Sequence, residues 1–333
     1  MTTRRKIRRT LLLAAAAWPA LAWAGAARAQ APAKVRRIGL LTPYSPSDTA
    51  LWHQAFRLGL RDLGWVEGKN ISIEYRYAEG RSDRLPDLAA DLVRLKVDVI
   101  VASVTSDALA AQKATRAIPI VMAVAGDPVA SGLVESLAQP GGNITGLSQM
   151  NVELVGKRLE LLKEMIPKLS RVAVLWNPQN TASTLNWKEI QLPARQLGIR
   201  LNSMEVRSPN DFDKAFEDAT RARAGALFIL PDTAIPTNLK RIAGLATRTR
   251  LPSIFHFSEF ADAGGLVTYG VDRADMYRRA ATFVDKILKG AKPGDLPIDR
   301  ATKFELVINM KTAKALGITI PQSVLLRADR VIE

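Results

Sequence analysis

Short apolar runs alternate with amphipathic stretches along most of this chain. The apolar run 38–41 is followed by a helical pattern over 50–63, which Gly64 ends. The alternating stretch 71–77 is followed by a second helical pattern over 82–95. Strand, helix, strand in regular succession is typical of right-handed βαβ units. This half of the chain therefore predicts an open, doubly wound parallel sheet.

Two further apolar runs of this sheet follow within residues 97–128. The run 97–103 leads into a polar stretch, 103–107, and then into a helical pattern from Ala108 to Arg116. The run 118–124 ends in Ala-Gly-Asp-Pro at 125–128. Near-continuous β-branched runs predict strands buried on both faces. Their polar ends are typical of the edge of a ligand cleft.

The same order of elements begins again in the second half. The apolar run 172–176 is followed by a helix to Gly198, a strand over 199–206, a helix over 208–223 and a strand over 226–230. This repetition predicts a second lobe of similar fold. A helix is predicted over 152–166, before the first of these strands. After them, strands are predicted at 251–255, 264–270 and 304–308, and helices over 274–289 and 312–316.

We expect the chain to cross between the lobes near residues 146, 271 and 298. Three crossings make a hinge, which permits two lobes to close over a solute. The predicted lobes are residues 36–146 plus 272–297 and residues 147–271 plus 298–330.

The first 29 residues predict a secretory signal peptide. A basic start over 4–9 precedes an apolar run over 11–24, and Ala27-Arg28-Ala29 supplies a small-x-small cleavage site. The apolar run is too short to span a bilayer. Arg8-Arg9 also fits a twin-arginine pattern loosely, so the export route stays open.

Charge and cysteine content narrow the class of protein. The sequence has 47 basic and 32 acidic residues, and without the six basic residues of the signal peptide 41 basic residues remain. These are spread along the chain, whereas a nucleic-acid face would gather them on one element. The sequence contains no cysteine, hence neither a disulfide nor a lipid-carrying cysteine is expected. We expect a free monomer in the periplasm.

Polar side chains follow the predicted strands at their carboxyl ends, where open α/β sheets bind ligands. Thr105 and Ser106 begin a helix whose free N–H groups suit a ligand carboxylate, although either hydroxyl could be an ordinary N-cap. Asp127 could pair with a ligand ammonium or hold its own turn. The candidate ligand-binding residues are Tyr44, Thr105, Ser106, Asp127, Asn177, Asp232, Glu259, Tyr269 and Asp272.

Catalytic chemistry finds little support in the sequence. The only histidines are His53 and His256. With no cysteine and no HExxH pair, a transition-metal site has few ligands. No nucleophile elbow or phosphate-binding glycine loop is present. We therefore expect no enzyme activity, no metal and no cofactor.

Four segments resemble a known family. They are Gly126-Asp127-Pro128, residues 140–146, residues 264–272 and residues 302–317. They are similar to the substrate-binding components of ABC importers of the tryptophan/tyrosine-uptake type, over nearly all of residues 36 to 325. The resemblance implies a type I periplasmic-binding-protein fold, a solute in the interlobe cleft and an ABC permease in the inner membrane as partner.

The function indicated is that of a periplasmic solute-binding component of an ABC importer. It would trap a small polar solute by hinge closure, with amino acids and aromatic compounds among the candidates. Two alternatives stay open: a ligand-sensing module that feeds a membrane receptor, and an exported hydrolase. Neighbouring genes distinguish the first alternative, and turnover of a ligand distinguishes the second.

Overall fold

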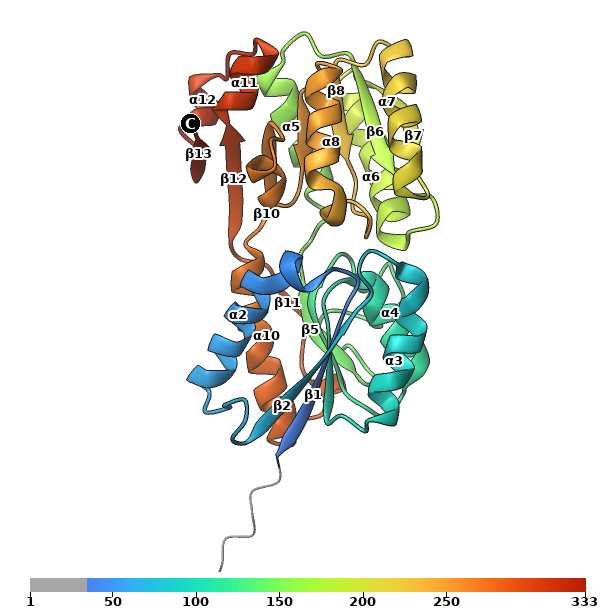
Figure 1. Cartoon of the computed structure of the whole chain (residues 1–333), viewed down its shortest axis with the longest axis vertical. Helices are drawn as coiled ribbons and strands as arrows, with labels where there is room; N and C mark the ends of the chain where they lie inside the picture. Colours follow the sequence, from blue (N-terminus) through green and yellow to red (C-terminus); the bar gives the residue numbers. More distant parts are fainter. Residues whose placement is uncertain (1–34) are drawn as a thin grey trace, which may run out of the picture. The chain divides into compact units, whose positions relative to one another are not determined.

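The computed structural model of the protein describes residues 35 to 333 (Figure 1). The predicted signal peptide, residues 1 to 29, lies outside the described residues. Two separate β-sheets organise the described chain. We call the elements around the six-stranded sheet the N-terminal lobe and those around the seven-stranded sheet the C-terminal lobe.

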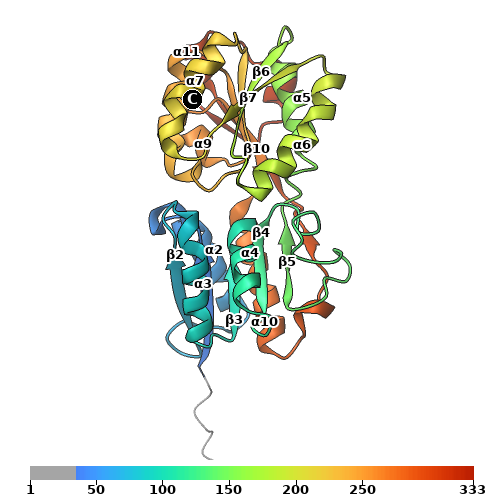
Figure 2. The same ribbon diagram turned by 90° about the vertical axis from the view of Figure 1, so that its right-hand side faces the viewer.

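The sheet of the N-terminal lobe is parallel throughout its paired strands. In spatial order its strands are β11 (Asp299–Arg300), β5 (Ile144–Ser148), β4 (Ile120–Ala125), β3 (Val99–Ala102), β1 (Arg36–Thr42) and β2 (Ile71–Tyr77). Its helices are α2 (Pro46–Asp62), α3 (Leu85–Arg94), α4 (Thr105–Ala114) and α10 (Arg273–Leu288). Helices α2 and α10 cover one face of this sheet, and α3 and α4 cover the other (Figures 1 and 2).

The C-terminal lobe repeats this layering. In spatial order its strands are β13 (Arg330–Ile332), β12 (Phe304–Asn309), β10 (Val267–Val271), β9 (Ser253–Phe255), β8 (Ala226–Ile229), β6 (Arg171–Trp176) and β7 (Arg200–Glu205). Its helices are α5 (Val155–Met165), α6 (Thr181–Gln196), α7 (Phe212–Arg221), α8 (Leu239–Arg248), α9 (Glu259–Asp262), α11 (Met310–Leu316) and α12 (Gln322–Leu325). Helices α5 and α6 pack on one face, and α7 and α8 on the other (Figures 1 and 2).

One strand pair differs from the expected parallel arrangement. Strands β10 and β12 are antiparallel, with Val267 opposite Ile308. The chain leaves β10 at its carboxyl end to enter the N-terminal lobe and returns to the C-terminal lobe from that side. Strand β12 therefore runs in the opposite direction.

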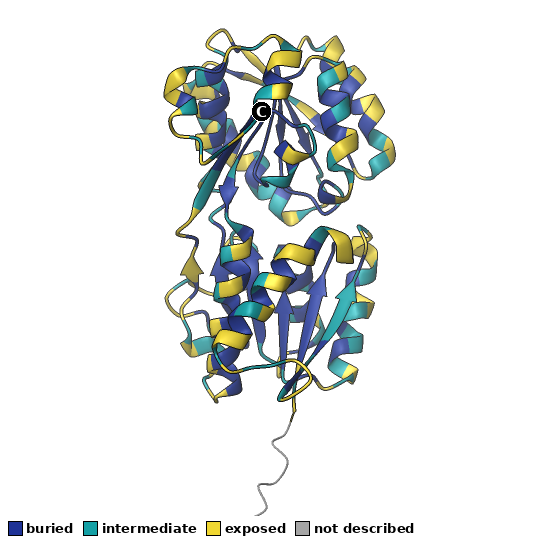
Figure 3. Cartoon of the chain, turned by 60° about the vertical axis from the view of Figure 1, so that its left-hand side comes forward, coloured by how far each residue is buried: buried dark blue, intermediate teal, exposed yellow. Residues whose placement is uncertain are grey.

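The strands form the cores of both lobes, and the outer helix faces are exposed (Figure 3). Helices α2 and α10 lie so close together at Gly59 that a Cβ atom there would be 2.6 Å from the carbonyl oxygen of Arg278. The absence of a side chain at Gly59 therefore permits this contact. Phe56 and Tyr277 are buried at this contact. Each such side chain contributes roughly 2 kcal/mol by leaving water. This packing places α10 in the N-terminal lobe, far along the chain from the rest of that lobe.

Three segments connect the lobes: 149–154 between β5 and α5, residue 272 between β10 and α10, and 301–303 between β11 and β12. The third segment lies later than the predicted crossing near 298, because Asp299 and Arg300 pair with β5. Arg158, fully buried, donates to the carbonyl of Tyr269 at 2.9 Å and to that of Asn151 at 3.3 Å. It therefore joins the first segment to β10, the strand that leads into the second segment.

Candidate functional site

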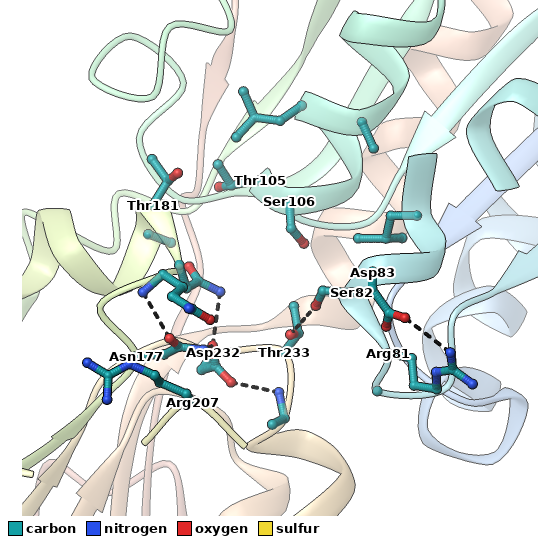
Figure 4. A pocket seen from close by; sticks show the side chains of 18 of the residues that line it. Arg81, Ser82, Asp83, Thr105, Ser106, Asn177, Thr181, Arg207, Asp232 and Thr233 are labelled. Carbon is teal, nitrogen blue, oxygen red and sulfur yellow. Dashed lines mark hydrogen bonds and ion pairs between the residues drawn. The ribbon is translucent and has the colours of Figure 1, made fainter. Parts of the chain in front are cut away.

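A cleft of about 620 Å³ lies where the carboxyl ends of strands from the two sheets face each other (Figure 4). The N-terminal lobe contributes residues 80–86 and the first turns of α4. The C-terminal lobe contributes the loops after β6, β7 and β8. In an open α/β sheet this edge is the usual ligand site.

The start of α4 forms the N-terminal-lobe wall of this cleft. The Oγ1 atom of Thr105 accepts a hydrogen bond from the N–H of Gly126 at 3.0 Å, which fastens the end of β4 to the helix. The Asp107 carboxylate accepts the N–H groups of Ser103 and Val104 and so serves as the cap. The Oγ atom of Ser106 is buried and has no hydrogen-bond partner among the described residues. Neither Thr105 nor Ser106 is an ordinary N-cap, and Ser106 is free to contact a ligand.

Asp232 forms the opposite wall, in the loop that follows β8. Its carboxylate accepts hydrogen bonds from Asn177 at 2.9 Å, Asn180 at 3.2 Å and the N–H of Ala234 at 2.9 Å (Figure 4). Burial raises the pKa of Asp232 above its ordinary value, because the charged form loses solvent. Among residues 35–333 no lysine or arginine forms an ion pair with it. A cationic group in the cleft would find a pre-positioned partner here.

A smaller cavity of about 30 Å³ extends inward from this cleft. The two share the polar residues Thr105, Ser106, Asn180, Asp232 and Thr233. The inner end of the smaller cavity is more aromatic. Its further lining residues are Tyr44, Val104, Gln149, Pro231, His256 and Phe257. Polar groups therefore lie at the junction of the two spaces, and aromatic rings lie beyond it.

Two groups of contacts join the lobes beside the cleft. Ser82 and Thr233 share a hydrogen bond of 2.6 Å between their hydroxyls (Figure 4). The second group surrounds Arg273, whose guanidinium carbon lies 3.5 Å from the ring centroids of both Trp52 and Phe257.

Glu259 completes the group around Arg273. It forms an ion pair with Arg273 and accepts a hydrogen bond from Trp52 Nε1 at 3.1 Å. Burial alone would raise the pKa of Glu259, but the charge of Arg273 and the hydrogen bonds from Arg273, Trp52 and the Glu259 backbone together lower that pKa. We call Trp52, Phe257, Glu259 and Arg273 the interlobe clamp. Its members come from both lobes, so it holds them together.

The structure brings five of the nine expected site residues to the cleft or inner cavity: Tyr44, Thr105, Ser106, Asn177 and Asp232. Glu259 lies in the interlobe clamp and borders a different hollow. Asp127 accepts the N–H groups of Val129 at 3.1 Å and Ala130 at 2.9 Å, so its carboxylate holds its own turn.

The other two expected residues lie on β10 and at the start of α10. Tyr269 stacks on Phe304, with ring centroids 6.4 Å apart. Asp272 is the N-cap of α10 and accepts the N–H of Asp275 at 3.0 Å. Neither borders the cleft or the inner cavity.

Sequence reasoning missed several residues of the site. Asn180 follows β6 within the same polar loop as Asn177, so a wider reading of that loop would have found it. His256 directly follows β9, but its loop position carried no further signal. Ser82 and Arg273 owe their roles to partners in the other lobe, which no local pattern reveals.

Residues 35–333 offer neither a metal centre nor a bilayer-spanning helix. No group of three or more His, Asp or Glu side chains there is placed to hold a metal ion. Likewise, no helix in this part of the chain combines the length and the apolar character that a bilayer crossing requires.

The sequence and the structure were compared with known proteins. A family model described as "ABC transporter substrate binding protein" matches residues 41–332. A conserved domain protein from Vibrio cholerae is 29% identical, with a TM-score of 0.85 that covers 90% of this chain and 100% of that one. An ABC domain from Streptococcus pneumonia in complex with L-Trp is 28% identical, with a TM-score of 0.81 over 89% of this chain and 100% of that one. A tyrosine-binding protein of Clostridioides difficile strain R20291 is 28% identical over 265 residues, which is 80% of this chain and 76% of that protein.

Proposed function

Since this chain belongs to the family of ABC transporter substrate-binding proteins, we propose that its cleft binds an amino acid with an aromatic side chain. Members of this family bind solutes for ABC importers and are binding proteins rather than enzymes. The partner is therefore a membrane permease, and the site of action is outside the cytoplasmic membrane. The identity of the solute rests on the geometry of the cleft.

The observation that carries the proposal is that Ser106 and Asp232 line the same cleft from opposite lobes (Figure 4). The ligand ammonium pairs with the buried Asp232 carboxylate in a charge-assisted hydrogen bond. The ligand carboxylate accepts from the unpartnered Ser106 hydroxyl. The positive end of the α4 dipole adds to the attraction. A zwitterion matches both walls at once.

The side chain of the ligand points inward from this head-group site. Tyr44 and Phe257 line the inner cavity, whereas none of the described residues that line the outer cleft is aromatic. The transfer of an apolar ring out of water is most favourable in free energy where the ring contacts other aromatic side chains. The inner cavity provides that lining. The L-Trp bound by the Streptococcus pneumonia structure and the name of the Clostridioides difficile relative support the same class of solute.

Closure then completes the site. The hydroxyls of Ser82 and Thr233 meet only when the lobes are together, and their contact helps to exclude water from the cleft. Charge-assisted bonds strengthen in a less polar surround. A micromolar dissociation constant is about −8 kcal/mol, which two such bonds and a buried ring can supply.

The finer localisation and the assembly state are part of the proposal. The signal-peptide pattern and the absence of cysteine support release as a free periplasmic monomer after residue 29. Mass spectrometry of the mature N-terminus and size-exclusion chromatography of the purified protein test both points. An uncleaved N-terminus or a stable dimer would contradict them.

Calorimetric titration with the twenty amino acids tests the proposed solute. We expect tyrosine, tryptophan or phenylalanine to bind with a micromolar or lower dissociation constant. Asp232→Asn should weaken that binding by about thirtyfold, since a buried charge pair is broken. Asp127→Asn is the matched control, because Asp127 holds its own turn outside the cleft. Failure of all aromatic amino acids to bind, or an unchanged affinity in Asp232→Asn, would refute the proposal.

A further inference from the structure

His256 has a buried side chain, and the fold of the described residues gives its two ring nitrogens no hydrogen-bond partner. It directly follows β9, is only 2% exposed and lines the inner cavity. Neither Nδ1 nor Nε2 has a hydrogen-bond partner among the described residues. Buried polar atoms in proteins are nearly always hydrogen-bonded, so an exception at a cavity indicates a group that comes from outside the chain.

Two guanidinium groups, those of Arg158 and Arg273, lie near enough to this imidazole for their charges to act on it. Arg158 donates a hydrogen bond to the carbonyl of Tyr269. Gly270, which follows Tyr269 in the chain, packs against the backbone carbonyl of His256. Arg273 lies over Phe257, whose ring centroid is 3.8 Å from that of His256.

The imidazole is neutral in this environment. Burial lowers the pKa of His256 well below its ordinary value, and the charges of Arg158 and Arg273 lower it further. A neutral imidazole offers one donor and one acceptor. The group that best satisfies it can accept one hydrogen bond and donate another.

We propose that His256 recognises a hydroxyl group on the ring of the bound amino acid, so that the cleft selects hydroxylated aromatic amino acids. The inference rests on the proposed function and names the solute more narrowly. A hydroxyl both donates and accepts, whereas an indole N–H only donates. The electron-rich hydroxyl oxygen is also favoured beside two guanidinium groups.

The position of His256 fits this role. The head-group residues Ser106 and Asp232 lie where the outer cleft and the inner cavity meet, and His256 lies on the aromatic side of them. The inner cavity of about 30 Å³ has room for about two water molecules. A ring is larger than that, so its entry requires the wall of the inner cavity to move outward from the arrangement described here.

The experiment compares L-tyrosine with L-phenylalanine by calorimetry on the purified full chain. The wild type should bind L-tyrosine at least about tenfold more tightly, because a site built to bind a hydroxyl rejects the analogue that lacks it. His256→Leu should reduce that ratio to near one. His256→Gln, which keeps a donor and an acceptor, should retain part of it.

His53→Leu is the matched control. His53 is also 2% exposed and has an unpartnered Nε2, but it packs against Tyr75 and Tyr77 and borders neither the outer cleft nor the inner cavity. Its replacement should leave the tyrosine-to-phenylalanine ratio unchanged. Each ratio compares two ligands on one protein, so a loss of stability common to both cancels.

Equal affinity of the wild type for the two ligands would overturn the inference and leave the proposed function standing; ordered water would then satisfy His256. A preference that survives in both His256→Leu and His256→Phe would overturn it as well. If L-tyrosine, L-phenylalanine and L-tryptophan all fail to bind, the proposed function itself is refuted. A preference lost in the two apolar variants and kept in part by His256→Gln is the result that supports it.

Discussion

Ser82 of the N-terminal lobe and Thr233 of the C-terminal lobe hold their hydroxyl oxygens 2.6 Å apart, although 151 residues separate them in sequence. The bond lies at the cleft, where Gly80 also approaches Thr237. Neither residue belongs to the hinge segments. The bond therefore contributes free energy only to the arrangement in which the lobes are together.

Removal of this bond should weaken ligand binding without affecting folding. Ser82→Ala should raise the apparent dissociation constant by about twofold to tenfold, because one neutral hydrogen bond is worth about 0.5–1.5 kcal/mol and the closed state becomes less populated. Thr233→Val should have a similar effect. The double variant should be little worse than either single variant, since both remove the same bond.

Calorimetry on the three variants measures this coupling. Ser136→Ala is the control, because that hydroxyl bonds only within its own loop, to the carbonyl of Gln139. Fully additive losses in the double variant would show that the two hydroxyls act independently of each other.

The interlobe clamp should stabilise the protein through Arg273. Arg273→Met keeps the length of the side chain but loses the charge, the planar stacking on Trp52 and Phe257, and the partner of Glu259. We expect a loss of about 3 kcal/mol in the free energy of unfolding, as for other broken buried pairs. Arg273→Lys should recover only part of it, since an ammonium cannot stack as a plane on two rings.

Urea denaturation of these variants measures the effect. Arg241→Met is the matched control: Arg241 also lies over a ring, that of Phe212 at 5.6 Å, and pairs with Asp213, but on the exposed surface. It should lose less than about 1 kcal/mol. Equal losses at positions 241 and 273 would contradict the role given to the clamp.

Asp107 should make stability fall as pH rises. Burial raises the pKa of this carboxyl to about 7 in the folded protein, against roughly 4 in an unfolded chain. The unfolded chain therefore ionises first. The contribution of Asp107 is fully present below about pH 4, declines up to about pH 7 and is constant above that. Asp107→Asn should abolish this decline.

The comparison is the free energy of unfolding of the wild type and the variant between pH 4 and 8. Asp211 provides a control of opposite sign, because it accepts the N–H groups of Arg207 and Ser208 at an exposed site, and these bonds lower its pKa. Its contribution is present above about pH 4 and is lost as pH falls through the folded pKa. Parallel curves for wild type and Asp107→Asn would contradict the assignment.

Gly270 should not tolerate a side chain. A methyl group there would collide with the carbonyl oxygen of His256, which is backbone and cannot move aside. Gly270→Ala should lower the melting temperature and disturb the inner cavity that His256 lines.

Gly244→Ala is the control for this substitution. Gly244 lies in α8, and the nearest atom to an added methyl group is 4.0 Å away. Alanine is the better helix former, so this variant should gain about 0.5–1 kcal/mol. Differential scanning calorimetry on both variants decides the point, and a Gly270→Ala protein as stable as the wild type would refute the close contact.

The sequence was sufficient to predict the family and most of the strands, because buried parallel strands appear in a sequence as continuous apolar runs. Strands β5, β11 and β13 were not predicted. The run 172–176 corresponds to β6, whose residues after Arg171 are all buried. The type I periplasmic-binding-protein fold implied by the resemblance is confirmed by the two-sheet topology and the structural matches. The direction of β12 and the end of the third crossing depend on pairing with distant strands, which no local pattern specifies.

The candidate site was harder to predict for a physical reason. Asp127 and Asp232 both follow buried strands, and their local patterns are alike. Each carboxylate accepts N–H groups from the turn that follows it, but Asp232 lines the cleft and the inner cavity, whereas Asp127 lines neither. Residues such as Arg273, whose partners come from the other lobe, could not be found from sequence spacing.

The central claim is that the lobes close over a solute. Small-angle X-ray scattering, with and without saturating L-tyrosine, tests it most directly on the purified protein. The account predicts that the ligand reduces the radius of gyration, and that Ser82→Ala reduces this compaction at a fixed subsaturating ligand concentration. Tight binding measured by calorimetry together with an unchanged radius of gyration would contradict it.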